Sequence, residues 1–295
     1  MKALIAVALL TACASAGSPQ APAEPKFDGQ RAFQDLRAMV EIGPRPSGSP
    51  EIEKTRDYIR KELAAAGLKV DEQAFDARTP TGTVHMVNLR ATLPGSSSSS
   101  GRIVIGGHYD TKLVKEFRFV GASDAASSAA FLLEIARALK GRANPLPIEL
   151  LFLDGEEAVV RWERQDHTYG SRYYVEQLKK AGAVQDVKAF ILVDMIGDTD
   201  LGIRREQNST AWLTDAIWSA AKKLERPEFL DEPTPIEDDH LEFLAAGIPS
   251  VDIIDLDYSA WHTAEDTLDR VSAKSLQAVG DVLLAALPAI ERRVK

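Results

Sequence analysis

Apolar residues along the chain follow two periods, one of which predicts helices and the other strands. Helical spacing of apolar positions occurs at residues 33–40, 49–67, 125–139 and 272–290. The second segment also has the end signals of a helix, because Pro50 suits a first helical position and Gly67 suits the position after a last turn. We therefore predict a helix in each of these regions.

Short aliphatic runs between the helices predict strands. These runs are residues 102–107, 148–153, 189–193 and 249–254, and residues 84–91 predict a further strand because they alternate in part, as a half-buried strand does. Glycine and serine dominate residues 95–101, which we interpret as the loop of a hairpin. Because strands alternate with helices, the pattern predicts an α/β fold, a three-layer α/β/α sandwich with a mixed, mostly parallel central sheet.

The first residues form a separate element. Lys2 and the apolar run of residues 3–10 are typical of an export signal, and no apolar run reaches the roughly 18–20 residues that a membrane span needs. The segment Leu10-Thr11-Ala12-Cys13 resembles the lipobox of bacterial lipoproteins, in which the signal is removed and the new N-terminal cysteine is acylated. The alternative is an ordinary secretory signal that is cut near Cys13.

We therefore expect three regions along the chain: a lipoprotein signal peptide over residues 1–12, a flexible tether over 13–29 and a single folded domain over 30–295. The tether is rich in alanine, proline and serine, so it has little to pack. Lipid on Cys13 would anchor the mature protein to a membrane. The expected location is the periplasmic side of a bacterial membrane, with the outer membrane as one option.

Composition excludes several classes of function. The chain has 35 Lys and Arg against 44 Asp and Glu, a net charge of −9, and no basic patch along its length. We therefore expect no nucleic-acid partner. Cys13 is the only cysteine, which excludes an internal disulfide and any zinc site with more than one thiolate ligand.

Polar residues gather where the predicted strands end. In open α/β sheets, ligands bind beyond the carboxyl ends of the strands. Imidazole and carboxylate donors, some at such strand ends and others in separate places along the chain, suit a catalytic zinc ion with an open position. The candidate ligands are His108, Asp124, Glu157, Asp194 and His262. For any one of these aspartates, the alternative is a helix cap or a solvated loop.

The local sequences around these residues resemble a known superfamily. GGHYDTK (106–112), GASD (121–124), DGEE (154–157) and WHT (261–263) are similar to motifs of the zinc aminopeptidases, or zinc exopeptidases. QDHTYGSR (165–172), DMIG (194–197) and DDHLEFL (238–244) are similar to segments of the animal-type glutaminyl cyclases within that superfamily. The resemblance covers about residues 33–290.

This resemblance implies a zinc-dependent acyltransferase that cyclises the N-terminal glutamine of peptides and proteins to pyroglutamate and releases ammonia. It implies one zinc ion on Asp124, Glu157 and His262, which polarises the γ-amide. Asp194 would then share a proton with Asp238 instead of binding metal. The alternative is an aminopeptidase in which all five candidate ligands hold two zinc ions. A second alternative is a peptide-binding module without catalysis.

The same resemblance assigns roles to the residues around the metal. Glu156 would accept a proton from the attacking α-amine and deliver it to the leaving ammonia. Asp194 and Asp238 would orient that amine. The indole rings of Trp162 and Trp261 would wall the substrate pocket. His108 and Asp110 would support the site from behind, through hydrogen bonds.

Two residues depart from the animal pattern. Asp252 stands in the strand where the animal cyclases carry a histidine. Glu237 stands where they carry a glutamine, so it adds a negative charge near the pocket mouth. The second change would favour substrates with a positively charged second residue.

Overall fold

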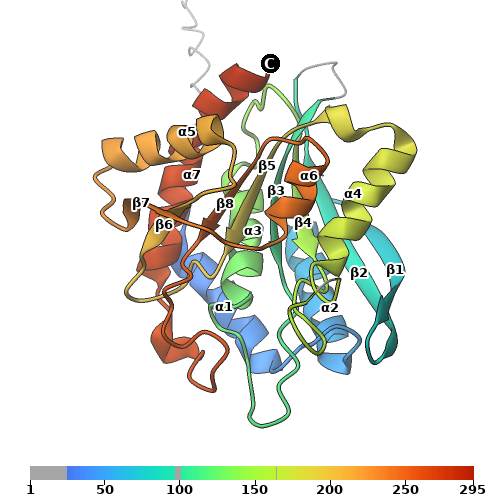
Figure 1. The fold of residues 1–295 in the computed structure, drawn as a ribbon. Coiled ribbons are helices and arrows are strands. Elements are labelled where there is room, and N and C mark those ends of the chain that lie inside the picture. The colour runs from blue at the N-terminus through green and yellow to red at the C-terminus, as the bar shows by residue number, and fades with distance from the viewer. Residues whose placement is uncertain (1–24, 97–100, 164) are drawn as a thin grey trace, which may run out of the picture.

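The computed structural model describes residues 25–96, 101–163 and 165–295, and a six-stranded sheet forms its centre (Figure 1). Across the sheet the strands lie in the order β1 (Val70–Thr79), β2 (Gly82–Leu93), β4 (Ile148–Leu153), β3 (Arg102–His108), β5 (Val187–Asp194) and β8 (Ser250–Ile254). The four strands from β4 to β8 are mutually parallel, whereas β1 and β2 form an antiparallel edge. The predicted mixed, mostly parallel sheet is confirmed.

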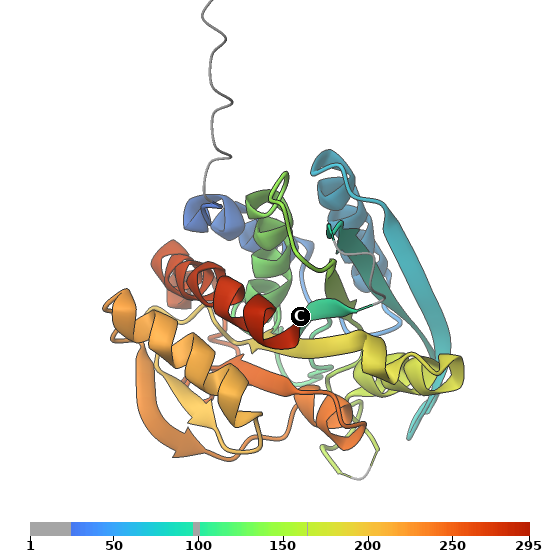
Figure 2. The ribbon, with the colours of Figure 1, turned by 90° about the horizontal axis from the view of Figure 1, so that it is seen from above.

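Helices cover both faces of this sheet, as the view from above shows (Figure 2). One layer contains α1 (Gly29–Ile42), α2 (Pro50–Ala65), α3 (Ala126–Ala138) and α7 (Ala273–Val294). The other contains α4 (Tyr169–Ala181) and α6 (His240–Ala245). Beside β8, helix α5 (Ala211–Lys223) packs on α7 and on a small sheet of β6 (Ile203–Glu206) and β7 (Phe229–Thr234). Two 3₁₀ turns, Val184–Asp186 and Leu268–Arg270, complete the described elements.

Helix α7 shows how amphipathic spacing becomes core packing. Leu276, Val279, Leu283 and Ile290 recur at helical spacing and are buried against the other helices. By length and composition α7 could also cross a membrane, although its sequence contains no uninterrupted apolar run of that length. Much of its apolar stretch is buried inside the domain, which is the behaviour of a core helix.

The folded domain includes residues just before the expected boundary at residue 30. Phe27 is buried, and its ring lies 5.0 Å from that of Phe131. Gly280 makes room for this ring, since a Cβ there would come within 2.1 Å of it. Asp28 caps α1 by accepting a hydrogen bond from the backbone N–H of Arg31. Residues 1–24, with Cys13 and the predicted signal peptide, lie outside the described residues.

The predicted hairpin at residues 95–101 is wrong. That connection joins β2 to β3, but β4 lies between these two strands in the sheet. The apolar run of β3 explains the arrangement, because it is buried on both faces and pairs in parallel with β4 and β5. The hairpin is formed instead by β1 and β2, with its turn between Thr79 and Gly82.

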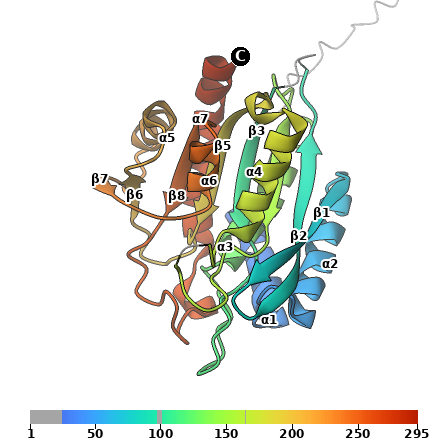
Figure 3. The ribbon, with the colours of Figure 1, turned by 45° about the vertical axis from the view of Figure 1, so that its right-hand side comes forward.

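The four parallel strands position the polar residues. Their carboxyl ends lie at one edge of the sheet, where the loops that follow them gather (Figure 3). His108 is the last residue of β3, Asp194 is the last residue of β5, and Asp154 directly follows β4. Loops from four strands therefore meet around one depression.

Candidate metal centre and active site

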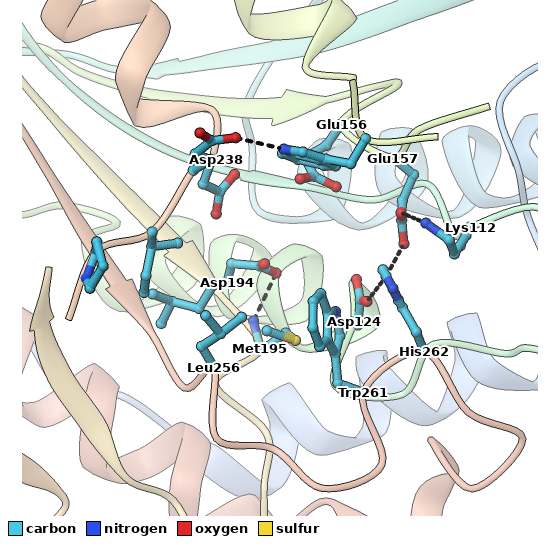
Figure 4. Close-up of a pocket in the computed structure, with 15 residues that line it drawn as sticks. Lys112, Asp124, Glu156, Glu157, Asp194, Met195, Asp238, Leu256, Trp261 and His262 are labelled. Carbon is cyan, nitrogen blue, oxygen red and sulfur yellow. Dashed lines mark hydrogen bonds and ion pairs between the residues drawn. The ribbon is translucent and has the colours of Figure 1, made fainter. Parts of the chain in front are cut away.

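Asp124 lies between two histidines at the centre of this depression. Its Oδ1 atom is 3.2 Å from Nε2 of His108, and its Oδ2 atom is 3.3 Å from Nε2 of His262. Nε2 of His262 also lies 3.2 Å from Oε1 of Glu157. On the other side, Nε2 of His108 lies 3.0 Å from Oδ1 of Asp194. Figure 4 shows the side chains of Asp124, Glu157 and His262 converging, with Asp194 in the same pocket.

The donors fall into two groups that share Asp124. Asp124, Glu157 and His262 offer ligand atoms within 4.8 Å of one another, and so do His108, Asp124 and Asp194. Imidazole nitrogens and carboxylate oxygens at this spacing suit zinc, so the residues present fit that metal. The geometry accommodates either one ion in the first group or one ion in each.

The close approach of these donors shifts the pKa values of Asp124 and His262. Burial opposes ionisation of Asp124, but hydrogen bonds with His108 and His262 outweigh it and hold the pKa of Asp124 below its usual range. Burial lowers the pKa of His262, but its contacts with Asp124 and Glu157 raise that pKa to about 9. A bound cation would have to displace this proton, because metal ligands bind in their deprotonated forms.

Asp266 fixes the backbone that carries Asp124. Its carboxylate accepts hydrogen bonds from the backbone N–H groups of Ser123 and Asp124, at 2.8 and 3.2 Å, and from the hydroxyl of Tyr258 at 2.7 Å. Sequence reasoning missed this residue. The one available signal was its position four residues after His262.

Arg45 is a second supporting residue that the sequence did not reveal. Its side chain is fully buried and donates hydrogen bonds to the backbone carbonyls of Tyr109, Val120 and Gly121. It therefore ties the segment after His108 to the segment before Asp124. Only a weak indication of this role is present in the sequence, because Arg45 lies in a turn rich in glycine and proline.

Asp154 follows a strand, but its carboxylate makes contacts that stabilise the fold. Its carboxylate pairs with the buried guanidinium of Arg56 at 2.5 Å and accepts a hydrogen bond from Ser47 at 2.6 Å. It also accepts the backbone N–H of Val87. The carboxylate is therefore fully engaged away from the depression.

Asp110 lies beside His108 and accepts hydrogen bonds from the backbone of two glutamates. Its Oδ1 atom lies 3.5 Å from Nδ1 of His108. The same carboxylate accepts the backbone N–H groups of Glu156 and Glu157, at 3.3 and 3.4 Å. These contacts are compatible with the supporting role expected for His108 and Asp110, which stays a prediction.

Glu156 is buried beside the metal donors and lines the same pocket. Burial raises its pKa well above the usual value, and the charges of Asp238 and Glu157 raise it further, against the opposing influence of His108. A buried carboxyl group whose pKa is raised in this way is suited to take up a proton and release it again.

The expected hydrogen bond between Asp194 and Asp238 is not formed. Oδ1 of Asp194 accepts from the backbone N–H of Met195 at 2.7 Å and from the hydroxyl of Ser128 at 3.2 Å, besides its contact with His108. Asp238 accepts from the backbone N–H of the next residue, and its Oδ2 atom is buried with no hydrogen-bond partner among the described residues. Asp194 therefore binds other partners. Burial is the largest cause of the raised pKa of Asp238, and the charge of Asp194 is the second.

A cavity of about 340 Å³ joins these groups to solvent. Trp261 is 43% exposed at its mouth, and its ring stacks on His262 at 4.4 Å. Trp162 lies on another wall, stacks on His167 at 4.2 Å and donates from Nε1 to Oε2 of Glu237 at 3.2 Å. Both tryptophans therefore line the pocket. Its remaining apolar lining is Met195, Pro235, Ile236, Ile254 and Leu256.

Comparisons with known proteins agree with this architecture. Residues 88–287 match Peptidase family M28. A glutaminyl-peptide cyclotransferase-like protein from Bos taurus is 32% identical over 284 residues, which cover 85% of this chain and 73% of that protein. The crystal structure of an Acidobacteriales bacterium glutaminyl cyclase superposes with a TM-score of 0.87 at 37% identity, covering 94% of this chain and 99% of the other.

A third similar structure has a different name. It is a leucine aminopeptidase precursor from Bacteroides thetaiotaomicron, with a TM-score of 0.80, 29% identity, and coverage of 89% of this chain and 97% of the other. The fold is thus that of the zinc exopeptidase class. The chain belongs to peptidase family M28 and, within it, to the glutaminyl-peptide cyclotransferases.

Proposed function

We propose that this enzyme cyclises the N-terminal glutamine of peptides and proteins to pyroglutamate and releases ammonia. The observation that carries the proposal is the composition of one pocket. Glu156, Asp194 and Asp238 line it together with the metal donors Asp124, Glu157 and His262. The similarity of the chain, over 94% of its length, to a structure named as a glutaminyl cyclase supports the same reaction.

The reaction needs one bond to form and one to break. The α-amine nitrogen attacks the γ-carbonyl carbon, the C–N bond to the side-chain nitrogen breaks, and one proton moves from the amine to the departing ammonia. Zinc on Asp124, Glu157 and His262 would supply Lewis-acid polarisation of the γ-carbonyl. Glu156 accepts the amine proton and then donates it to the leaving nitrogen. Since both reacting groups belong to one residue, positioning contributes much of the rate.

The surrounding side chains orient the glutamine and limit water. Asp194 and Asp238 provide carboxylate oxygens for the amine, and Oδ2 of Asp238, which has no hydrogen-bond partner within the described part of the chain, is available to accept a hydrogen bond from it. Trp162 and Trp261 present apolar surface along the pocket walls. Water that cannot enter cannot compete with the amine for the carbonyl carbon.

A single assay separates this function from the main alternative. The purified protein, loaded with zinc, is incubated with glutamine naphthylamide, and both ammonia and free naphthylamine are measured. Ammonia alone supports cyclisation. Naphthylamine alone supports a two-zinc aminopeptidase, for which the second donor group of His108, Asp124 and Asp194 is the specific observation. Neither product would indicate peptide binding without catalysis.

We propose further that Cys13 carries a lipid that anchors the enzyme on the periplasmic side of a bacterial membrane. The lipobox-like segment at residues 10–13 supports this proposal. In a bacterial host, the full-length protein should sediment with membranes, and Cys13→Ser should move it to the soluble fraction. A wild-type protein that is soluble after cell lysis would contradict the anchor.

A further inference from the structure

A second hollow adjoins the catalytic pocket. Its volume is about 350 Å³, and it shares Trp162, Glu237 and Asp238 with the pocket that holds the metal donors. The rest of its described lining is Glu163, His167, Thr168, Leu241 and Glu242. A molecule bound in the catalytic pocket can therefore extend past these three shared residues into the second hollow.

The second hollow is acidic. Glu237 and Glu163 are exposed, Glu242 is partly buried, and all three belong to its lining. Among its described lining residues, the one basic type is His167, whose ring is stacked on Trp162. Several carboxylates on one small surface attract a cation and repel an anion.

Glu237 is held in place where the two hollows meet. The N–H of the Trp162 indole donates to its Oε2 atom, and stacking on His167 fixes the indole in turn. Asp238, the next residue, lines both hollows and has a buried Oδ2 atom without a hydrogen-bond partner among the described residues. The shared wall thus presents one fixed carboxylate and one unsatisfied acceptor.

Substrate geometry connects the two hollows. In an N-terminal glutamine, the α-amine and the carbonyl that leads to the second residue are attached to the same carbon. Figure 4 shows Glu156 and Asp238 on the side of the pocket away from Trp261 and Leu256. Consecutive Cα atoms are about 3.8 Å apart. If the α-amine of the glutamine binds near Glu156 and Asp238, the Cα of the second residue therefore lies close to the wall that the two hollows share.

We propose that the second hollow is the subsite for the second residue of the substrate, and that it selects lysine or arginine there. This inference rests on the proposed cyclisation and adds a substrate class to it. Trp162 and Leu241 contact the aliphatic part of such a side chain, and Glu237, Glu242 and Glu163 attract its charged end.

The test compares two peptides that begin Gln-Lys and Gln-norleucine and are otherwise identical, because norleucine has an unbranched alkyl side chain without the ammonium group. Ammonia release at low salt should give a kcat/KM about 5-fold higher for the lysine peptide, the effect expected of a few solvent-exposed carboxylates. The ratio should approach 1 at high salt, since exposed charges are screened. A Gln-Glu peptide should be the slowest substrate.

Two substitutions test whether the second hollow causes the preference for lysine. Glu237→Gln keeps an acceptor for the Trp162 N–H and removes the charge, and it should lower the ratio to about 2, as should Glu242→Gln. Glu176→Gln is the matched control, because this exposed glutamate pairs with Lys180 on α4, outside both hollows. Equal rates for both peptides in the wild type, or an unchanged ratio in both variants, would overturn the subsite.

Failure of the subsite and failure of the proposed function give different results. Equal ammonia release from both peptides contradicts the subsite alone. If neither peptide yields ammonia from zinc-loaded protein, the cyclisation proposal fails, and calorimetric binding of the two peptides then decides on the subsite. Tighter binding of the lysine peptide that is lost in Glu237→Gln supports it, and equal binding overturns it.

Discussion

Oδ1 of Asp194 lies 3.0 Å from Nε2 of His108, which directs this carboxylate toward the metal donors and away from Asp238. The same oxygen accepts hydrogen bonds from the N–H of Met195 and the hydroxyl of Ser128. Because this oxygen already accepts two hydrogen bonds, only the other carboxylate oxygen of Asp194 is left for a metal. The position of Asp194 therefore bears directly on how many ions the site holds.

We predict that the protein retains about one zinc ion per chain after desalting, bound through the group that contains His262. His262→Ala should remove most of that zinc, whereas Asp194→Asn should leave the zinc content unchanged and still reduce ammonia release. Elemental analysis by mass spectrometry measures the ratio of metal to protein. Two zinc ions per chain, with one lost in Asp194→Asn, would favour the aminopeptidase arrangement.

Glu156→Gln should lower kcat for ammonia release by about 10²- to 10⁴-fold, because glutamine has the shape of glutamate but cannot take up the amine proton. Zinc content should remain at the wild-type level, since Glu156 belongs to neither donor group. Glu157→Gln serves as the contrast and should lose zinc together with activity. A Glu156→Gln enzyme with near-normal kcat would exclude Glu156 as the proton carrier.

Asp266→Ala should weaken zinc binding about 10- to 100-fold, although Asp266 belongs to neither donor group. The substitution frees the backbone N–H groups of Ser123 and Asp124, so the central carboxylate loses its fixed position. Competition with a fluorescent zinc chelator measures the affinity. Asp269→Ala, at an exposed aspartate three residues later, is the control and should bind zinc normally.

Stability should fall as pH rises through the neutral range, in part because of Asp239. Burial raises the pKa of Asp239 to about 7, although a hydrogen bond from Ser171 favours its ionised form. The folded protein therefore holds this proton more tightly than the unfolded chain, whose aspartates titrate near about 3.9. The contribution to stability is fully present below about pH 4 and is lost as pH rises through about 7.

Urea unfolding with chelator present, at pH 5 and pH 8, checks this prediction. The free energy of unfolding of the wild type should drop between the two pH values, and Asp239→Asn should reduce the drop, because the amide does not ionise. Asp200→Asn changes an exposed aspartate and should leave the drop unchanged. An identical drop in Asp239→Asn would show that Asp239 does not cause it.

β2 could be predicted from its partial alternation of apolar and polar residues, and the other predicted strands are buried on both faces. Such strands read as continuous apolar runs, and β4 was placed at its observed limits of residues 148–153. The edge strand β1 consists largely of polar and partly exposed residues, so no apolar run marked it. Likewise, nothing local to residues 95–101 reveals that β4, from much later in the chain, inserts beside β2.

The candidate site divides in the same way. The donors could be proposed because histidine, aspartate and glutamate stood at or near strand ends in recognisable local sequences. Arg45 and Asp266 could not, because their roles arise from contacts between segments far apart in sequence. The direction in which Asp194 turns was also beyond reach, since it depends on Ser128 from a different element.

The link from Asp266 to Asp124 spans 142 residues and brings almost the last loop of the domain against a loop in its first half. Closing so long a loop is entropically costly and depends on the sheet between the two ends, so we expect the donor set to become complete late in folding. A chain that stops before His262 would contain every strand segment of the central sheet yet lack the core helix α7, one candidate metal donor and the residue that fixes Asp124. We therefore expect zinc uptake to report completed folding and to separate intact molecules from truncated ones.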